Sequence, residues 1–151
     1  MVKFFDIISN ENEVFRSFAF WSVVLLVKTL AMAYLTGRVR WTKKVSANEE
    51  DAAKYNAKIK FDDPDVERVR RAHRNDLENI FPFILVAFFY VLTNPEPTLA
   101  INLFRIAAIA RIIHTLVYAV WVVPQPARGL AFFVCLASTL YMAFKTILFF
   151  M

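Results

Sequence analysis

The sequence has 151 residues, of which 58% are hydrophobic and 16% aromatic. This composition exceeds what one soluble core of this size can bury and therefore indicates a membrane protein. The net charge is +5, but 11 of the 18 basic and nine of the 13 acidic residues lie within 37–79. This mixed block argues against a basic nucleic-acid-binding surface. The single cysteine, Cys135, excludes an intrachain disulfide, and the absence of a Cys/His cluster predicts no metal site.

Four apolar segments are long enough, alone or with their flanks, to cross a bilayer as helices. The second is preceded by Asp62-Asp63-Pro64-Asp65, which supplies a capping carboxylate and a first-turn proline. Its helix is therefore expected to begin at about Pro64, in water, before entering the membrane. The sequence thus predicts one all-α membrane domain, a four-transmembrane-helix bundle. The expected spans are about residues 14–36, 76–94, 98–123 and 129–150, with a polar loop at 37–63.

Four spans place the 37–63 loop and the turn containing Arg128 on one side of the membrane, and both termini on the other. The first side carries 12 basic residues in or near its loops, against Lys3 and Arg16 on the second. The excess of positive charge predicts that the loop side is cytoplasmic. A soluble bundle of unusually apolar helices is the alternative, and the number and length of the apolar runs disfavour it.

The most polar stretch, 67–79, leads directly into the second span. At about 100° per residue, Arg71, Asn75 and Glu78 fall on one helix face, with Arg74 at its border. Guanidinium groups bind carboxylates and a carboxylate accepts from an ammonium, so this face suits a ligand that carries both groups. The alternative is a solvated helix end with ion pairs such as that of Arg74 with Glu78.

The third span places Arg111, His114 and Tyr118 on one face by their spacing. Ionisable side chains at membrane depth normally face a bundle interior or a wet cavity, so a functional or interhelical polar site is predicted here. Arg105 points away from this face. Lys28 lies in the middle of the first span, and its role is left open beyond snorkelling or an interhelical pair.

Arg128 is expected at the cytoplasmic start of the fourth span, where an interface anchor is the ordinary interpretation. Beside the other arginines it becomes a candidate for stabilising an anionic reactive group. A nearby guanidinium favours the thiolate form of a thiol, which is the nucleophilic form. Cys135 lies in apolar sequence and is expected to be inert packing, so the thiol would come from a ligand.

Nearly the whole chain resembles the family of membrane-associated proteins in eicosanoid and glutathione metabolism. The motifs that carry this resemblance are Thr36-Gly37-Arg38-Val39-Arg40, Ala47-Asn48-Glu49-Glu50-Asp51, the run from Asp65 to Phe83, Arg111-Ile112-Ile113-His114-Thr115 and Pro124-Gln125-Pro126-Ala127-Arg128. The resemblance implies a homotrimer of four-helix subunits, with glutathione as co-substrate between neighbouring subunits on the cytoplasmic side. It also implies an endoplasmic reticulum location, with the outer mitochondrial membrane as the alternative.

By motif match, the resemblance assigns two roles to this chain's residues. Arg128 would stabilise the glutathione thiolate, and Asp51 matches an acidic residue proposed to assist the chemistry in the prostaglandin E synthases of this family. The residues that would form or support the glutathione site are Arg40, Arg71, His73, Arg74, Asn75, Glu78, Arg111, His114 and Tyr118.

The function implied is a glutathione transferase that acts on lipophilic electrophiles, with glutathione-dependent reduction of lipid hydroperoxides as a further activity. The alternative within the family is a prostaglandin E synthase. Gly129 and Phe132 stand where such a synthase carries a serine and a tyrosine, and they disfavour that alternative. An alternative of another class is a non-catalytic tetraspan scaffold or channel, whose intramembrane Arg and His would pair helices or line a pore. The expected partners are membrane lipid, glutathione and lipophilic substrates, and not nucleic acid.

Overall fold

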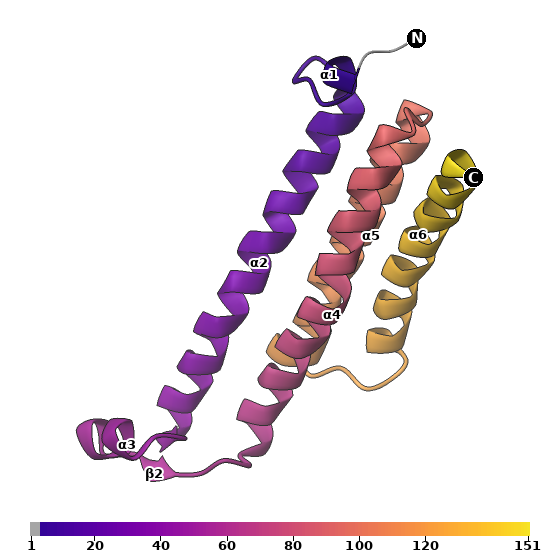
Figure 1. The fold of residues 1–151 in the computed structure, drawn as a ribbon. Coiled ribbons are helices and arrows are strands. Elements are labelled where there is room, and N and C mark those ends of the chain that lie inside the picture. Colours follow the sequence, from indigo (N-terminus) through magenta and orange to yellow (C-terminus); the bar gives the residue numbers. More distant parts are fainter. Residues whose placement is uncertain (1–3) are drawn as a thin grey trace.

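Four long helices dominate the computed structural model, which describes residues 4–151 (Figure 1). Each is long and apolar enough to cross a membrane. They are α2 (Glu13–Lys43), α4 (Pro64–Leu92), α5 (Pro97–Thr115), which continues as the π-helical turn η1 (Leu116–Val120), and α6 (Ala127–Phe150). The smaller elements are α1 (Phe4–Ile7), β1 (Val45–Ser46), α3 (Glu49–Tyr55) and β2 (Lys58–Ile59).

The helix ends follow from capping residues. The Asn12 side chain accepts hydrogen bonds from the backbone N–H of Val14 and Phe15 at the start of α2. Asp63 caps α4 in the same way, and Pro64 occupies the first turn as the sequence predicts. Helix α2 ends only at Lys43, so residues 37–43, which the sequence analysis assigns to the 37–63 loop, are helical. Its C-cap, Lys44, adopts the left-handed conformation.

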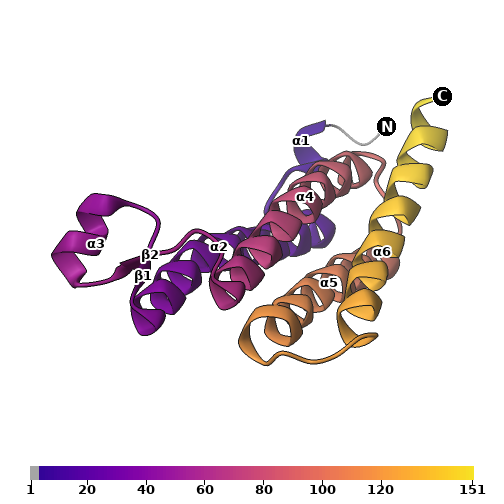
Figure 2. The ribbon, with the colours of Figure 1, turned by 90° about the horizontal axis from the view of Figure 1, so that it is seen from below.

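The long helices form a ring in which each packs against two main neighbours. α2 packs against α4 and α5, and α6 packs against the same two helices. Seen from below, α3 stands apart from this bundle (Figure 2). It packs chiefly on the parallel pair β1–β2, in which Val45 pairs with Lys58 and Ser46 with Ile59. The charged segment between α2 and α4 is therefore a small folded unit rather than an irregular loop.

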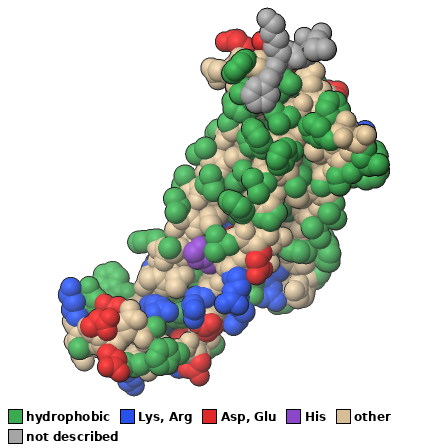
Figure 3. Space-filling view, viewed as in Figure 1, with side chains coloured by type: hydrophobic (Ala, Val, Ile, Leu, Met, Phe, Trp, Pro, Cys, Tyr) green, Lys and Arg blue, Asp and Glu red, His purple; other side chains and the backbone are tan. Residues whose placement is uncertain are grey.

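The two ends of the bundle differ in composition. The short helix α1 and the C-terminal end of α6 lie at one end with the α4–α5 turn, whereas α3, β2 and the α5–α6 connection lie at the other (Figure 1). Lysine and arginine side chains gather across this second end, while hydrophobic side chains cover the helices above it (Figure 3). This is the arrangement that four antiparallel spans with a polar loop side require.

The bundle buries aromatic and aliphatic side chains between the helices. Phe18 packs against Phe88 and Phe104, with ring centroids 6.0 Å apart in both pairs. Large apolar side chains also remain exposed on all four long helices, Phe20, Phe81, Ile106 and Phe133 among them. In water this surface would be unfavourable, whereas it suits a surrounding of lipid.

Candidate functional site

The polar face of α4 is directed away from the bundle. The helix buries Val69, Ala72 and Asp76, so Arg71, Arg74 and Glu78 lie on its exposed side. The neighbouring arginines are engaged, since Arg68 pairs with Asp65 at 2.9 Å and Arg70 pairs with Glu67 at 2.5 Å.

By contrast, Arg71, Arg74 and Glu78 form no hydrogen bond or ion pair with any residue in the range 4–151. The Arg74–Glu78 pair of the solvated-surface alternative is therefore not formed. Two guanidinium groups and one carboxylate remain available on this face for a ligand. The half-buried His73 also has no hydrogen-bonding partner within the described chain.

Behind this face lies a buried cluster of charged side chains. Asp76 is fully buried and its Oδ1 accepts a hydrogen bond from Arg111 Nη2 at 2.5 Å. Its Oδ2 forms an ion pair with the ammonium of Lys28 and accepts a hydrogen bond from the Thr115 hydroxyl at 3.3 Å. Helices α2, α4 and α5 therefore meet around one carboxylate. Arg111 Nη2 also donates to Asn75 Oδ1 at 2.9 Å.

Arg111 is fully buried and His114 is only 4% exposed. This agrees with the prediction that the ionisable residues of the third span face the bundle interior. Lys28, whose role the sequence leaves open, forms an interhelical ion pair with Asp76. Arg105 is exposed and has no ion-pair partner in the described part of the chain.

Sequence reasoning missed Asp76 because it lies within a run of charges. Its signal was position: Asp76 falls on the same helix stripe as Val69, Ala72, Ile80 and Phe83, all of which are buried. An acidic residue on an otherwise apolar stripe must find a cation inside the bundle.

Arg128 joins the fourth helix to the third. Its guanidinium carbon lies 4.5 Å from the centre of the Tyr118 ring, which is cation–π distance. Tyr118 in turn contacts His114 edge-on, with ring centroids 5.5 Å apart. Tyr118 lies in the π-helical turn η1, which widens the end of the helix next to the α5–α6 connection. The structure therefore brings together three of the predicted residues, His114, Tyr118 and Arg128.

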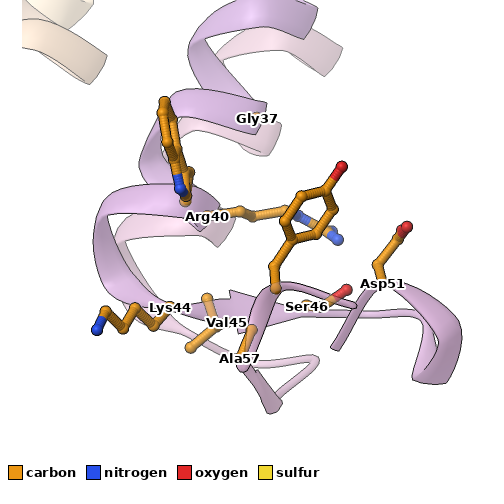
Figure 4. Close-up of a pocket in the computed structure, with 9 residues that line it drawn as sticks. Gly37, Arg40, Lys44, Val45, Ser46, Asp51 and Ala57 are labelled. Atoms are coloured by element: carbon orange, nitrogen blue, oxygen red, sulfur yellow. The ribbon is translucent and has the colours of Figure 1, made fainter. Parts of the chain in front are cut away.

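Arg40 and Asp51 line a separate pocket of about 530 Å³ beneath the end of α2. The Arg40 side chain extends from the last turns of α2 toward the side of the pocket where Asp51 of α3 lies (Figure 4). Asp51 accepts a hydrogen bond from the Asn48 side chain at 3.1 Å. Because α3 packs chiefly on β1 and β2, Asp51 lies apart from the α4 face. The other lining residues are Gly37, Trp41, Lys44, Val45, Ser46, Tyr55 and Ala57.

The predicted residues thus fall into an exposed α4 face, an interior group running from Arg111 to Arg128, and the pocket of Arg40 and Asp51. Across the part of the chain that the structure describes, no three His, Cys, Asp or Glu side chains are grouped so as to hold a metal ion. The arrangement combines free cations with one free carboxylate at the polar end of an apolar bundle. Such a site suits a small zwitterionic or anionic ligand.

Residues 18–148 match the MAPEG family model. The chain belongs to the MAPEG family. It is 45% identical to microsomal glutathione S-transferase 1 of Homo sapiens over 141 residues, which cover 89% of this chain and 90% of that protein. The protein of the same name in Bos taurus is 48% identical, with the same coverage. Prostaglandin E synthase of Rattus norvegicus is 37% identical over 139 residues, with 89% and 90% covered. MAPEG stands for membrane-associated proteins in eicosanoid and glutathione metabolism, so the match confirms the family indicated by the sequence motifs.

Proposed function

We propose that this MAPEG protein is a membrane glutathione transferase that conjugates the thiolate of glutathione to lipophilic electrophiles. The observation that carries the proposal is the similarity to microsomal glutathione S-transferase 1, which is 45% identical in Homo sapiens over nine-tenths of both chains. Glutathione is then the co-substrate. Lipid hydroperoxides are the second substrate class that we propose: two glutathione thiols reduce one hydroperoxide to an alcohol and water and are themselves oxidised to glutathione disulfide.

The exposed face of α4 supports binding of this tripeptide. Glutathione carries two carboxylates and one ammonium group, and the face offers Arg71, Arg74 and Glu78 without partners in the described chain. Each arginine can bind a carboxylate through two parallel hydrogen bonds, while Glu78 accepts from the ammonium. Asn75 adds an amide at the edge of the same face.

Arg128 is suited to stabilising the thiolate. It lies in the first turn of α6, where the helix dipole is already positive. A cation at this end is unfavourable unless an anion is bound nearby, and the Tyr118 ring holds the guanidinium in place. A thiol beside this pair would have a lowered pKa and a larger thiolate fraction at neutral pH. Reaction then requires only positioning and electrostatic stabilisation, with no covalent enzyme intermediate.

A homotrimer would complete the site. Arg71, Arg74 and Glu78 point away from their own bundle, whereas Arg128 is held against Tyr118 within it. A neighbouring subunit packed on α4 would enclose the ligand between the two groups. The apolar side chains Phe81, Leu85 and Phe89, exposed on α4, are available for such a contact.

The charged end of the bundle is proposed to face the cytoplasm, where glutathione is available. The excess of basic residues at this end supports that orientation. Lipophilic electrophiles would reach the site from the bilayer. We propose the endoplasmic reticulum as the membrane, in keeping with the word microsomal in the names of the similar transferases.

A prostaglandin E synthase is the second candidate, because the Rattus norvegicus synthase is 37% identical to this chain. The structure leaves room for a serine at position 129, which the family resemblance associates with the synthase. A Cβ on Gly129 would lie 3.4 Å from Gln125 Oε1, an ordinary contact with the end of a flexible side chain. Packing therefore does not require a glycine at position 129, and its lack of a hydroxyl group is a chemical difference from a serine-containing site.

Two assays on the purified protein test the proposal. The transferase function predicts conjugation of glutathione to a chlorinated dinitrobenzene, with little isomerisation of prostaglandin endoperoxide. The opposite result would support the synthase. A protein that binds no glutathione and performs neither reaction would be a scaffold or channel.

A further inference from the structure

We propose that Asp76 is a positioning residue for the glutathione site, acting through Arg111 on Asn75. This inference rests on the function proposed above. Neither Asp76 nor Lys28 belongs to the residues predicted to bind glutathione. The buried charge cluster would set the direction in which the Asn75 amide faces the ligand.

The Asp76 carboxylate is held at both oxygens. Oδ1 accepts from Arg111 Nη2 at 2.5 Å, and Oδ2 meets Thr115 and Lys28. Contacts from two other helices therefore prevent the carboxylate from rotating. The fixed carboxylate in turn holds Arg111 Nη2, whereas Nε and Nη1 of the same guanidinium are buried and have no hydrogen-bonding partner among the described residues.

Arg111 then orients Asn75. A guanidinium has only donors, so the side-chain atom of Asn75 that faces it must be the acceptor Oδ1. The observed contact is Arg111 Nη2 to Asn75 Oδ1 at 2.9 Å. The amide nitrogen of Asn75 is thereby turned away from the cluster, and it donates to no residue in the described chain. Because Asn75 is half-buried at the edge of the exposed face that carries Arg71 and Arg74, we infer that this donor is available to a ligand on that face.

The burial of the three side chains shows which of them a ligand can reach. Asp76 and Arg111 are both completely inaccessible, whereas Asn75 is half-buried at the edge of the exposed face. Arg111 therefore acts on a ligand through Asn75 rather than by touching it. The cluster contains two cations, Lys28 and Arg111, and both pair with the one carboxylate of Asp76. Among the described contacts, no second acid is present to replace it.

The experiment measures steady-state conjugation by the full-length protein with Asp76→Asn, which keeps the shape of the side chain and removes its charge. We expect the KM for glutathione to rise about tenfold, the loss of one well-placed hydrogen bond to a charged group. The KM for the electrophile and the kcat at saturating glutathione should change little. Asp65→Asn is the matched control, because Asp65 lies on the same helix in ion pairs with Lys43 and Arg68 but has no contact with Asn75.

A double-mutant cycle separates positioning from general stability. If Asp76 acts through Asn75, Asp76→Asn should have almost no further effect on the KM for glutathione in an Asn75→Ala background. Equal effects in both backgrounds would overturn the proposal. So would a fall in kcat with an equal rise in both KM values, since a loosened bundle would produce it.

Asn75→Asp tests the same step without disturbing the core. It keeps an acceptor for Arg111 and replaces the outward donor with a carboxylate oxygen that repels the carboxylates of glutathione, so the protein should stay folded while the KM for glutathione rises. An unchanged KM would show that the Asn75 amide does not face the ligand and would refute the inference, also where Asp76→Asn does not fold. If the wild-type protein neither binds glutathione nor conjugates it, the proposed function itself is refuted. The two failures are therefore distinguishable.

Discussion

The Arg128 guanidinium lies over the Tyr118 ring, 4.5 Å from its centre, and so connects the start of α6 to the end of the third helix. This contact fixes a long, otherwise mobile cation beside the proposed thiolate. A cation–π contact is worth about 0.5–2 kcal/mol, depending on its exposure.

Tyr118→Leu should therefore lower kcat/KM for conjugation by about 2-fold to 30-fold, because Arg128 loses the ring that positions it. Tyr118→Phe is the matched control, since it keeps the ring and removes only the hydroxyl. Steady-state kinetics on both variants measure the difference. Equal losses in the two would mean that the hydroxyl, and not the ring face, matters.

The charge balance around Asp76 predicts unequal effects on stability. Asp76→Ala leaves Lys28 and Arg111 buried without an anion, so it should lower the free energy of unfolding by about 3–5 kcal/mol. Lys28→Met leaves the balanced pair of Asp76 and Arg111 and should cost far less. Thermal or detergent-induced unfolding in micelles measures both. A larger loss in Lys28→Met would contradict the assignment of Asp76 as the centre of the cluster.

The Glu96 carboxylate caps α5 outside the apolar part of the bundle. It accepts hydrogen bonds from the backbone N–H of Leu99 at 2.7 Å and Thr98 at 2.9 Å, and these bonds hold the pKa of Glu96 below its ordinary 4.5. Its contribution to stability is therefore complete above that value and is lost as the pH falls through the lowered pKa.

Glu96→Ala should consequently lower Tm slightly at neutral pH, on the order of 2 °C, by removing the cap. Glu96→Gln keeps an acceptor oxygen that does not titrate, so its Tm should fall less than that of the wild type on acidification. Calorimetry at a series of pH values, from neutral to below the lowered pKa of Glu96, measures the Tm of each variant. Identical pH profiles would show that the cap does not titrate in the folded protein.

Cys135 lies inside the bundle, with only 2% of its surface exposed. We expect maleimide reagents to leave the folded protein unmodified and Cys135→Ala to conjugate glutathione at a rate close to that of the wild type, because the reacting thiol belongs to the ligand. Mass spectrometry and the conjugation assay test the two statements. Rapid labelling, or a large loss of activity in the well-folded variant, would point to a role for this thiol.

The sequence predicts the main helices well because their signals are local. Apolar length marks the four spans, and Asp63 with Pro64 marks the start of α4. By contrast, β1 and β2 contain two residues each and offer no periodic pattern. The π-helical turn at Leu116–Val120 consists of apolar residues that are equally compatible with an ordinary helix.

The candidate site shows the same limit at the level of single side chains. Arg111 and His114 were singled out because ionisable side chains at membrane depth are conspicuous, and Tyr118 because it shares their helix face. Asp76 was missed because eight other acids surround it in the 37–79 block, although its position on the apolar stripe of α4 could have distinguished it. Its two cationic partners on α2 and α5 follow only from the packing of the helices. Periodicity places Asn75 on the ligand face, but the direction of its amide follows from the contact with Arg111 alone.

We propose that Arg128 stabilises the thiolate of bound glutathione. Its most direct test is the ultraviolet absorbance of the glutathione thiolate when glutathione is titrated into the purified protein at neutral pH. We expect a thiolate signal in the wild type and in Arg105→Ala, a control on the exposed side of α5, and a signal reduced about tenfold or more in Arg128→Ala. A thiolate signal of full size in Arg128→Ala, with glutathione bound, would contradict it.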